Sequence, residues 1–73
     1  MFNVKVIGSN MTEVRCEKGI ILVSYETPVA ACLNGQYIRT AKKWSNTTTR
    51  HINKWLEGMQ AKTVEQSVLD GLL

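Results

Sequence analysis

The dipeptide Asn34-Gly35 constrains the fold of this chain more than any other short stretch. It follows the apolar run VAACL and precedes QYIRT. Both central residues of a type I′ turn need positive φ, which Asn and Gly tolerate, so we predict a two-residue β-hairpin here. That loop length pairs Cys32 with Tyr37 and places Tyr37 and Arg39 on the same face of the sheet.

Three further strands are expected before the hairpin. Residues 2–7 and 12–17 alternate between apolar and polar side chains, which is typical of half-buried strands. In the first of them, Phe2, Val4 and Val6 form the apolar face. Residues 20–25 are an apolar, β-branched run, which suits a central strand covered on both faces. Pro28 cannot donate to a ladder, so we expect a bend, a bulge or a strand start there.

After Thr40 the apolar period changes from two to 3.6, which indicates an amphipathic helix. Ser45 is the expected N-cap, and Gly58 is the expected stop. We expect the buried arc of this helix, which holds both tryptophans as core anchors and His51 at its margin, to consist of Trp44, Thr48, Ile52, Trp55, Leu56 and Met59.

A second, shorter helix is predicted from Thr63, because Thr63 and Gln66 match a capping box. The chain then ends in an apolar stripe, which we expect to dock on its own sheet or on a second subunit. A chain of 73 residues has a small core, which supplies roughly 3–5 kcal/mol. A homodimer is therefore expected. The stripe consists of Val64, Val68, Leu69, Leu72 and Leu73.

These elements predict one α+β domain over residues 1–73. Its architecture is an antiparallel β-meander of four or five short strands, followed by the amphipathic helix and the short C-terminal helix. The composition, with 44% hydrophobic and 21% charged residues, is that of an ordinary globular domain.

Signals for export or membrane insertion are missing from the sequence. The start, MFNVKVIGSN, lacks a basic region followed by an apolar run, and no apolar run approaches the ~20 residues of a membrane helix. We therefore expect a cytoplasmic protein with no membrane partner. In the cytosol, Cys16 and Cys32 are expected as free thiols rather than as a disulfide. A zinc site from these cysteines and His51 would lack a fourth ligand, so no metal or cofactor is predicted.

Enzymatic chemistry is not predicted, and no catalytic residue is assigned. His51 is the single histidine, and no triad, paired carboxylates, P-loop, GxGxxG or HExxH accompanies it. We expect His51 to be a half-buried helix residue that is hydrogen-bonded to the backbone.

Positive charge is concentrated in residues 36–56, QYIRTAKKWSNTTTRHINKWL, which hold five basic and no acidic residues. The remainder has four basic against six acidic residues, so a segment of +5 is joined to a remainder of −2. Such a segment favours phosphate contacts, although an ordinary solvated face has the same composition. Tyr37 is a possible stacking residue. The predicted nucleic-acid-binding residues are Arg39, Lys42, Lys43, Thr47, Arg50 and Lys54.

Residues 22–56, with SYETPVA, YIRT and KKWSNTTTRHINKWL, resemble short uncharacterised proteins encoded by bacteriophages. The resemblance implies a viral accessory protein in the cytosol of a host cell, and it assigns no functional residue. Three functions follow as expectations. The first is nucleic-acid binding through residues 36–56. The second is inhibition of, or anti-defence docking on, a host or defence protein. The third is a small nucleotide binder that uses Tyr37, Arg39 and Arg50.

Overall fold

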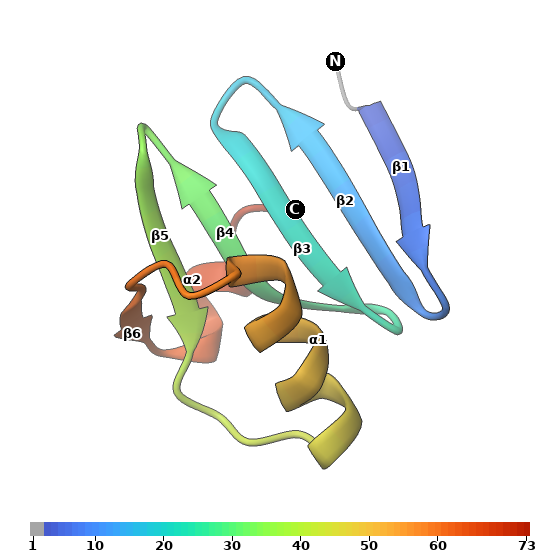
Figure 1. Ribbon diagram of the computed structural model, residues 1–73. Helices are drawn as coiled ribbons and strands as arrows, with labels where there is room; N and C mark the ends of the chain where they lie inside the picture. Colours follow the sequence, from blue (N-terminus) through green and yellow to red (C-terminus); the bar gives the residue numbers. More distant parts are fainter. Residues whose placement is uncertain (1–2) are drawn as a thin grey trace.

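The computed structural model describes residues 3–73 as a six-stranded sheet with one helix on each face (Figure 1). The strands follow each other in chain order across the sheet, and every pair is antiparallel except β5–β6. The α+β class and the meander are therefore confirmed, with a sixth, parallel strand added. The elements are β1 (Asn3–Gly8), β2 (Met11–Cys16), β3 (Gly19–Ser24), β4 (Thr27–Leu33), β5 (Gln36–Thr40), α1 (Asn46–Leu56), β6 (Lys62–Val64) and α2 (Gln66–Asp70).

The predicted hairpin is present with the predicted register. Asn34 and Gly35 have φ of 51° and 79°, as a type I′ turn requires. Across β4 and β5, Cys32 is opposite Tyr37 and Ala30 is opposite Arg39. The turn therefore predicts correctly which side chains of this hairpin face α1.

Strand β3 is the centre of the core, as its uninterrupted apolar sequence predicts. Ile21 and Leu22 are both fully buried, and they lie on opposite faces of the sheet. Pro28 lies at the start of β4, opposite a register shift between Leu22 and Val23, so both a strand start and an irregularity are found there.

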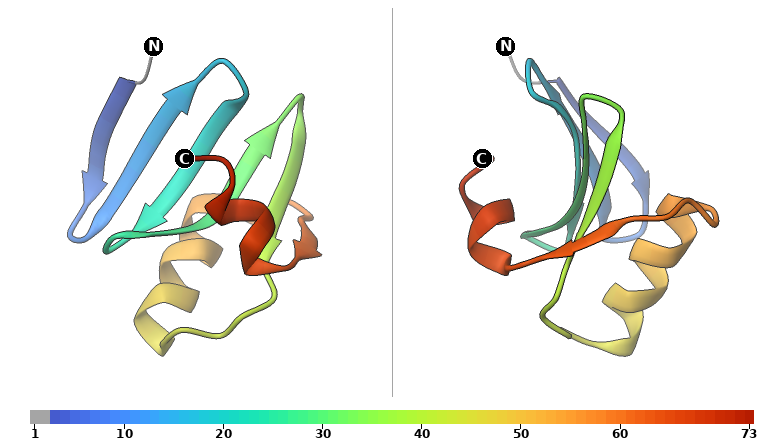
Figure 2. Two further views of the ribbon diagram at one scale, coloured as in Figure 1. Left: turned by 180° about the vertical axis from the view of Figure 1, so that it is seen from behind. Right: turned by 90° about the vertical axis from the view of Figure 1, so that its left-hand side faces the viewer.

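The two helices lie on opposite faces of the sheet (Figure 2), and a separate apolar cluster holds each of them there. On one face, Ile52 and Leu56 of α1 pack with Leu22. On the other, Leu69 of α2 packs with Ile21 and is fully buried. Each helix therefore contributes its apolar side to a different half of the core.

The predicted apolar face of the first strand is not buried. Val4 and Val6 are 61% and 75% exposed, because α2 lies over the middle of the sheet and does not reach β1. Ile7, which follows them, is half-buried and packs against the α1 cluster instead. Phe2 lies outside the described residues.

Helix α1 begins at the predicted cap and ends at the predicted stop, just before Gly58, but its buried arc is shorter than predicted. The Ser45 hydroxyl accepts a hydrogen bond from the Thr48 amide at 3.0 Å. Trp44 and Met59 lie beyond the two ends of the helix and are 43% and 54% exposed, so their assignment to the buried arc is wrong. The helix stops at Leu56 because the next residues adopt left-handed backbone.

The capping box predicted at Thr63 is absent, because residues 62–64 form β6 beside β5. The later helix α2 has Glu65 as its N-cap, without a side-chain hydrogen bond. The Gln66 side chain instead accepts from the Thr40 hydroxyl at 2.7 Å and donates to the Pro28 carbonyl at 2.7 Å. These hydrogen bonds join α2 to the sheet. In the described part of the chain, neither helix has the length and apolarity that crossing a membrane requires.

Candidate nucleic-acid interface

The five basic side chains of residues 36–56 have no acidic partner in the part of the chain that the structure describes. Four of them are exposed and Arg39 is half-buried. The one ion pair among the described residues joins Arg15 to Glu13 at 3.5 Å, outside this segment. The positive charges are therefore not neutralised within residues 3–73.

Three of the predicted residues, Arg39, Lys42 and Lys43, line one hollow where β5 leads into α1. The hollow has a volume of about 270 Å³ and is also lined by Thr49. Arg39 donates from Nη1 to Asn53 Oδ1 at 3.2 Å, which holds the guanidinium against α1. The remaining guanidinium donors have no hydrogen-bond partner among the described residues. This is a small basic recess, and its two hydroxyl groups, on Thr40 and Thr49, already donate within the protein.

The other predicted residues, Thr47, Arg50 and Lys54, are exposed on α1. They follow the helix at spacings of three and four residues and so form one stripe along it. The Nζ atom of Lys42 lies 4.1 Å from the centre of the Trp44 ring, where the ring face attracts the cation. The stripe and the basic recess together form the basic segment of the surface.

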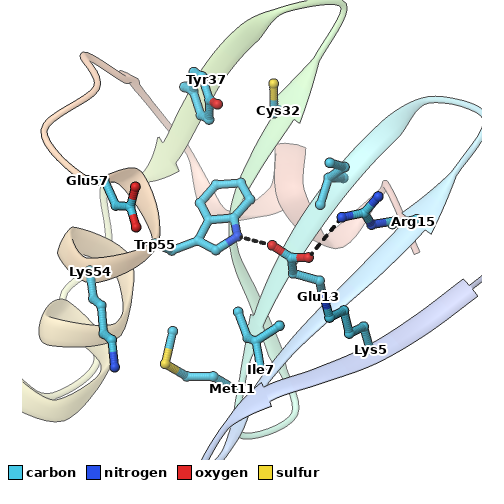
Figure 3. A pocket seen from close by; sticks show the side chains of 11 residues that line it. Lys5, Ile7, Met11, Glu13, Arg15, Cys32, Tyr37, Lys54, Trp55 and Glu57 are labelled. Atoms are coloured by element: carbon cyan, nitrogen blue, oxygen red, sulfur yellow. Dashed lines mark hydrogen bonds and ion pairs between the residues drawn. The ribbon is translucent and has the colours of Figure 1, made fainter.

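A larger cleft lies between α1 and strands β1 and β2, and it contains only one of the predicted basic residues, Lys54 (Figure 3). Its volume is about 420 Å³. The predicted stacking residue Tyr37 also lines it, with its ring edge-on to Trp55 at 5.9 Å between ring centres. Lys5, Glu13 and Arg15 are the charged residues of its strand side, and sequence reasoning did not select them. The sequence contained one signal that could have identified them, because the alternation places these three side chains on the same face of β1 and β2.

His51 is half-buried as predicted, but its partner is a side chain and not the backbone. Its Nδ1 atom lies 2.8 Å from Ser24 Oγ, which in turn lies 3.1 Å from Thr48 Oγ1. Ser24 is 2% exposed, so this hydroxyl pair lies almost fully inside the protein. The three side chains tie α1 to the end of β3.

The two cysteines are free thiols on opposite faces of the sheet. Cys16 packs with the α2 cluster, whereas Cys32 lines the cleft beside Trp55. His51 is bonded to Ser24 elsewhere, so these three residues do not converge on a shared ligand position.

The residues suggested for a nucleotide site are also separated. Tyr37 lines the cleft beside Trp55, Arg39 lines the basic recess, and Arg50 lies on the exposed stripe and lines neither.

Comparison with known proteins gives one match. No curated protein and no solved structure matches the chain significantly. A family model described as "Family of unknown function (DUF8033)" matches residues 2–71, which is nearly the whole chain. The protein therefore belongs to the DUF8033 family.

Proposed function

We propose that this protein is a non-enzymatic accessory protein that binds nucleic acid through residues 36–56. Its contacts are to phosphates, made by the basic recess and by the stripe on α1. The resemblance of residues 22–56 to short bacteriophage proteins supports a viral role in a host cytosol. The phosphate contacts themselves rest on charge and geometry.

One observation carries the proposal: the five basic side chains of this segment have no carboxylate partner among the described residues. Arg50 and Lys54 are one helical turn apart, so their like charges repel by a few tenths of a kcal/mol. A bound polyanion relieves that repulsion and releases its counterions, which is the main source of affinity in non-specific nucleic-acid binding.

The test compares two double variants that lose the same charge. Arg50→Ala/Lys54→Ala removes two cations from the stripe, and Lys18→Ala/Lys62→Ala removes two exposed cations outside residues 36–56. Binding to a fluorescent 20-base-pair duplex and to a 20-nucleotide single strand is measured by anisotropy at fixed salt.

We expect the stripe variant to lose at least about tenfold in affinity, while the control variant stays near wild type. Both variants should unfold within about 0.5 kcal/mol of wild type, because the four residues are exposed. If both double variants lost the same affinity, binding would depend on the overall charge of the protein and not on the stripe. An absence of binding by wild type to DNA and to RNA would refute the proposal.

A second candidate function is binding to a protein, and the exposed valines of β1 favour it. Val4 and Val6 lie on a sheet face that α2 leaves open, and β1 is the edge strand with one unpaired side. Antiparallel pairing of two β1 strands would place these valines beside their own copies. We infer that a second copy of the chain covers them, which retains the expected homodimer but moves its contact from the C-terminal stripe. Leu69 of that stripe is fully buried on its own sheet.

Sedimentation velocity tests this contact in wild type and in Val6→Lys. A dimer that becomes a monomer in the variant supports it. A wild-type monomer at high concentration refutes the homodimer and leaves the face to the alternative occupant, a host or defence protein. An unchanged dimer in Val6→Lys places the contact elsewhere.

A further inference from the structure

The cleft between α1 and strands β1 and β2 combines a fixed aromatic ring with cations from both of its walls (Figure 3). Trp55 extends from the last turn of α1 across the cleft toward Glu13 of β2. Its indole nitrogen donates to Glu13 Oε2 at 2.7 Å. Lys5 and Arg15 come from the strands, and Lys54 comes from the helix. Glu57, which follows the helix, is a second carboxylate of the lining.

The hydrogen bond to Glu13 fixes the indole in one orientation. The Glu13 side chain is only 15% exposed, and its second oxygen lies 3.5 Å from the Arg15 guanidinium. A carboxylate that is mostly buried must be paired, and here the two partners are a ring and a cation of the cleft. Glu13 is therefore a positioning residue for both. The Tyr37 ring, edge-on to the indole at 5.9 Å, supports the platform from the other side.

We propose that this cleft binds one nucleotide, with its base against the Trp55 indole and its phosphate beside Arg15 and Lys5 on the strand wall. A planar base suits an aromatic platform, and an anionic group suits the two cations of the strand wall. The volume of about 420 Å³ falls within the range of about 300–1,000 Å³ of small-molecule sites.

Lys54 belongs both to the stripe on α1 and to the lining of the cleft. A strand that follows the stripe from Arg50 therefore arrives at the cleft, where one unpaired base can enter. In this form the inference rests on the proposed function. A free nucleotide has the same base and phosphate, so experiments must distinguish it from an unpaired nucleotide of a strand.

The first experiment uses anisotropy with Trp55→Leu, which keeps an apolar group in the cleft and removes the platform. The probes are a ten-nucleotide oligodeoxyadenylate and a blunt 20-base-pair duplex, whose bases are all paired. We expect the variant to lose about 5- to 150-fold in affinity for the single strand, the range for one base stacked on an aromatic ring. Its affinity for the duplex should remain within about twofold.

A second variant keeps the test valid if Trp55→Leu does not fold. Arg15 is 53% exposed, so Arg15→Ala should fold normally. It should make the log–log salt slope of single-strand binding less steep by about 0.7, as expected for one lost phosphate contact. Lys18→Ala is its control, because it removes one exposed cation from the turn after β2.

The second experiment uses the two cysteines of the wild-type chain. Cys32 lines the cleft, and Cys16, which is also half-buried, lies on the other face of the sheet. A nucleotide in the cleft should slow alkylation of Cys32 by iodoacetamide and leave Cys16 unchanged, as measured by peptide mass spectrometry. AMP and the oligonucleotide are tested separately. Protection by AMP identifies a free nucleotide as a ligand, and protection by the oligonucleotide alone identifies a strand.

The outcomes distinguish this inference from the proposed function. Equal loss of duplex and single-strand binding in Trp55→Leu, or an unprotected Cys32 with both ligands, overturns the cleft site even if Arg50→Ala/Lys54→Ala still weakens binding. If AMP protects Cys32 but no nucleic acid binds, the nucleotide site is supported and the proposed function is refuted.

Discussion

Substitution of Gly19 by alanine should be among the most destabilising small changes in this fold. Gly19 has φ of +144°, and a Cβ at this position would lie 2.1 Å from the Cys32 carbonyl oxygen. The backbone conformation alone costs an alanine about 1–3 kcal/mol. The carbonyl belongs to β4, which pairs with β3, so moving it weakens one or two ladder hydrogen bonds, each worth about 0.5–1.5 kcal/mol.

The two effects together lower the free energy of unfolding by about 1.5–6 kcal/mol. A domain of this length has only about 4–11 kcal/mol in total. At about 4–8 °C for each kcal/mol, we expect Tm to fall by at least about 6 °C. Circular dichroism at 218 nm during heating measures it.

Gly35→Ala is the matched control for this prediction. Gly35 also has positive φ, at +79°, but a Cβ there meets nothing within 4 Å. In this variant the free energy of unfolding should fall by about 1 kcal/mol, which lowers Tm by about 4–8 °C. A Tm for Gly19→Ala that equals or exceeds the Tm of Gly35→Ala would refute the steric reasoning.

Two further stability predictions concern hydrogen-bonded polar side chains, of which Gln66 is half-buried and Ser24 is buried. Gln66→Ala should cost about 2–4 kcal/mol, because the Thr40 hydroxyl, the Trp44 indole N–H and the Pro28 carbonyl all lose a partner. Exposed Gln36→Ala is its control in thermal unfolding, and equal Tm values would contradict the role of Gln66. Ser24→Ala should cost about 1–3 kcal/mol, because its hydroxyl contacts both Thr48 and His51, and unfolding in urea with an unchanged midpoint would contradict this.

The parts of the fold that sequence reasoning predicted are those specified by local chemistry. The Asn34-Gly35 turn sets the register of β4 and β5 without help from the rest of the chain. The Ser45 cap is a contact over three residues, and it starts α1 where predicted. In both cases the deciding atoms lie within a few residues of each other.

The errors occur where distant contacts decide the structure. Residues 62–64 match a helix start, but β5 offers them a free edge and they become β6. Gln66 is then used for contacts with Pro28 and Trp44, which are 38 and 22 residues away. The alternation that identifies β1 predicts its faces but not that α2 leaves Val4 and Val6 uncovered.

The candidate interface divides in the same way. The charge of residues 36–56 is visible in the sequence, because it depends only on which residues are present. The cleft depends on α1 crossing the sheet so that Trp55 meets Glu13, 42 residues away. No local pattern contains that crossing, so Lys5 and Arg15 were not predicted as its neighbours.

The central claim, that residues 36–56 contact phosphates, is tested most directly by the salt dependence of duplex binding. The observed association constant of wild type is measured between 50 and 300 mM NaCl. With all five basic residues of the segment engaged, the log–log slope should approach about −4.5, or 0.9 for each phosphate. It should become less steep by about 1.8 in Arg50→Ala/Lys54→Ala. A slope near zero, or one that is the same in wild type and in this variant, would contradict the claim.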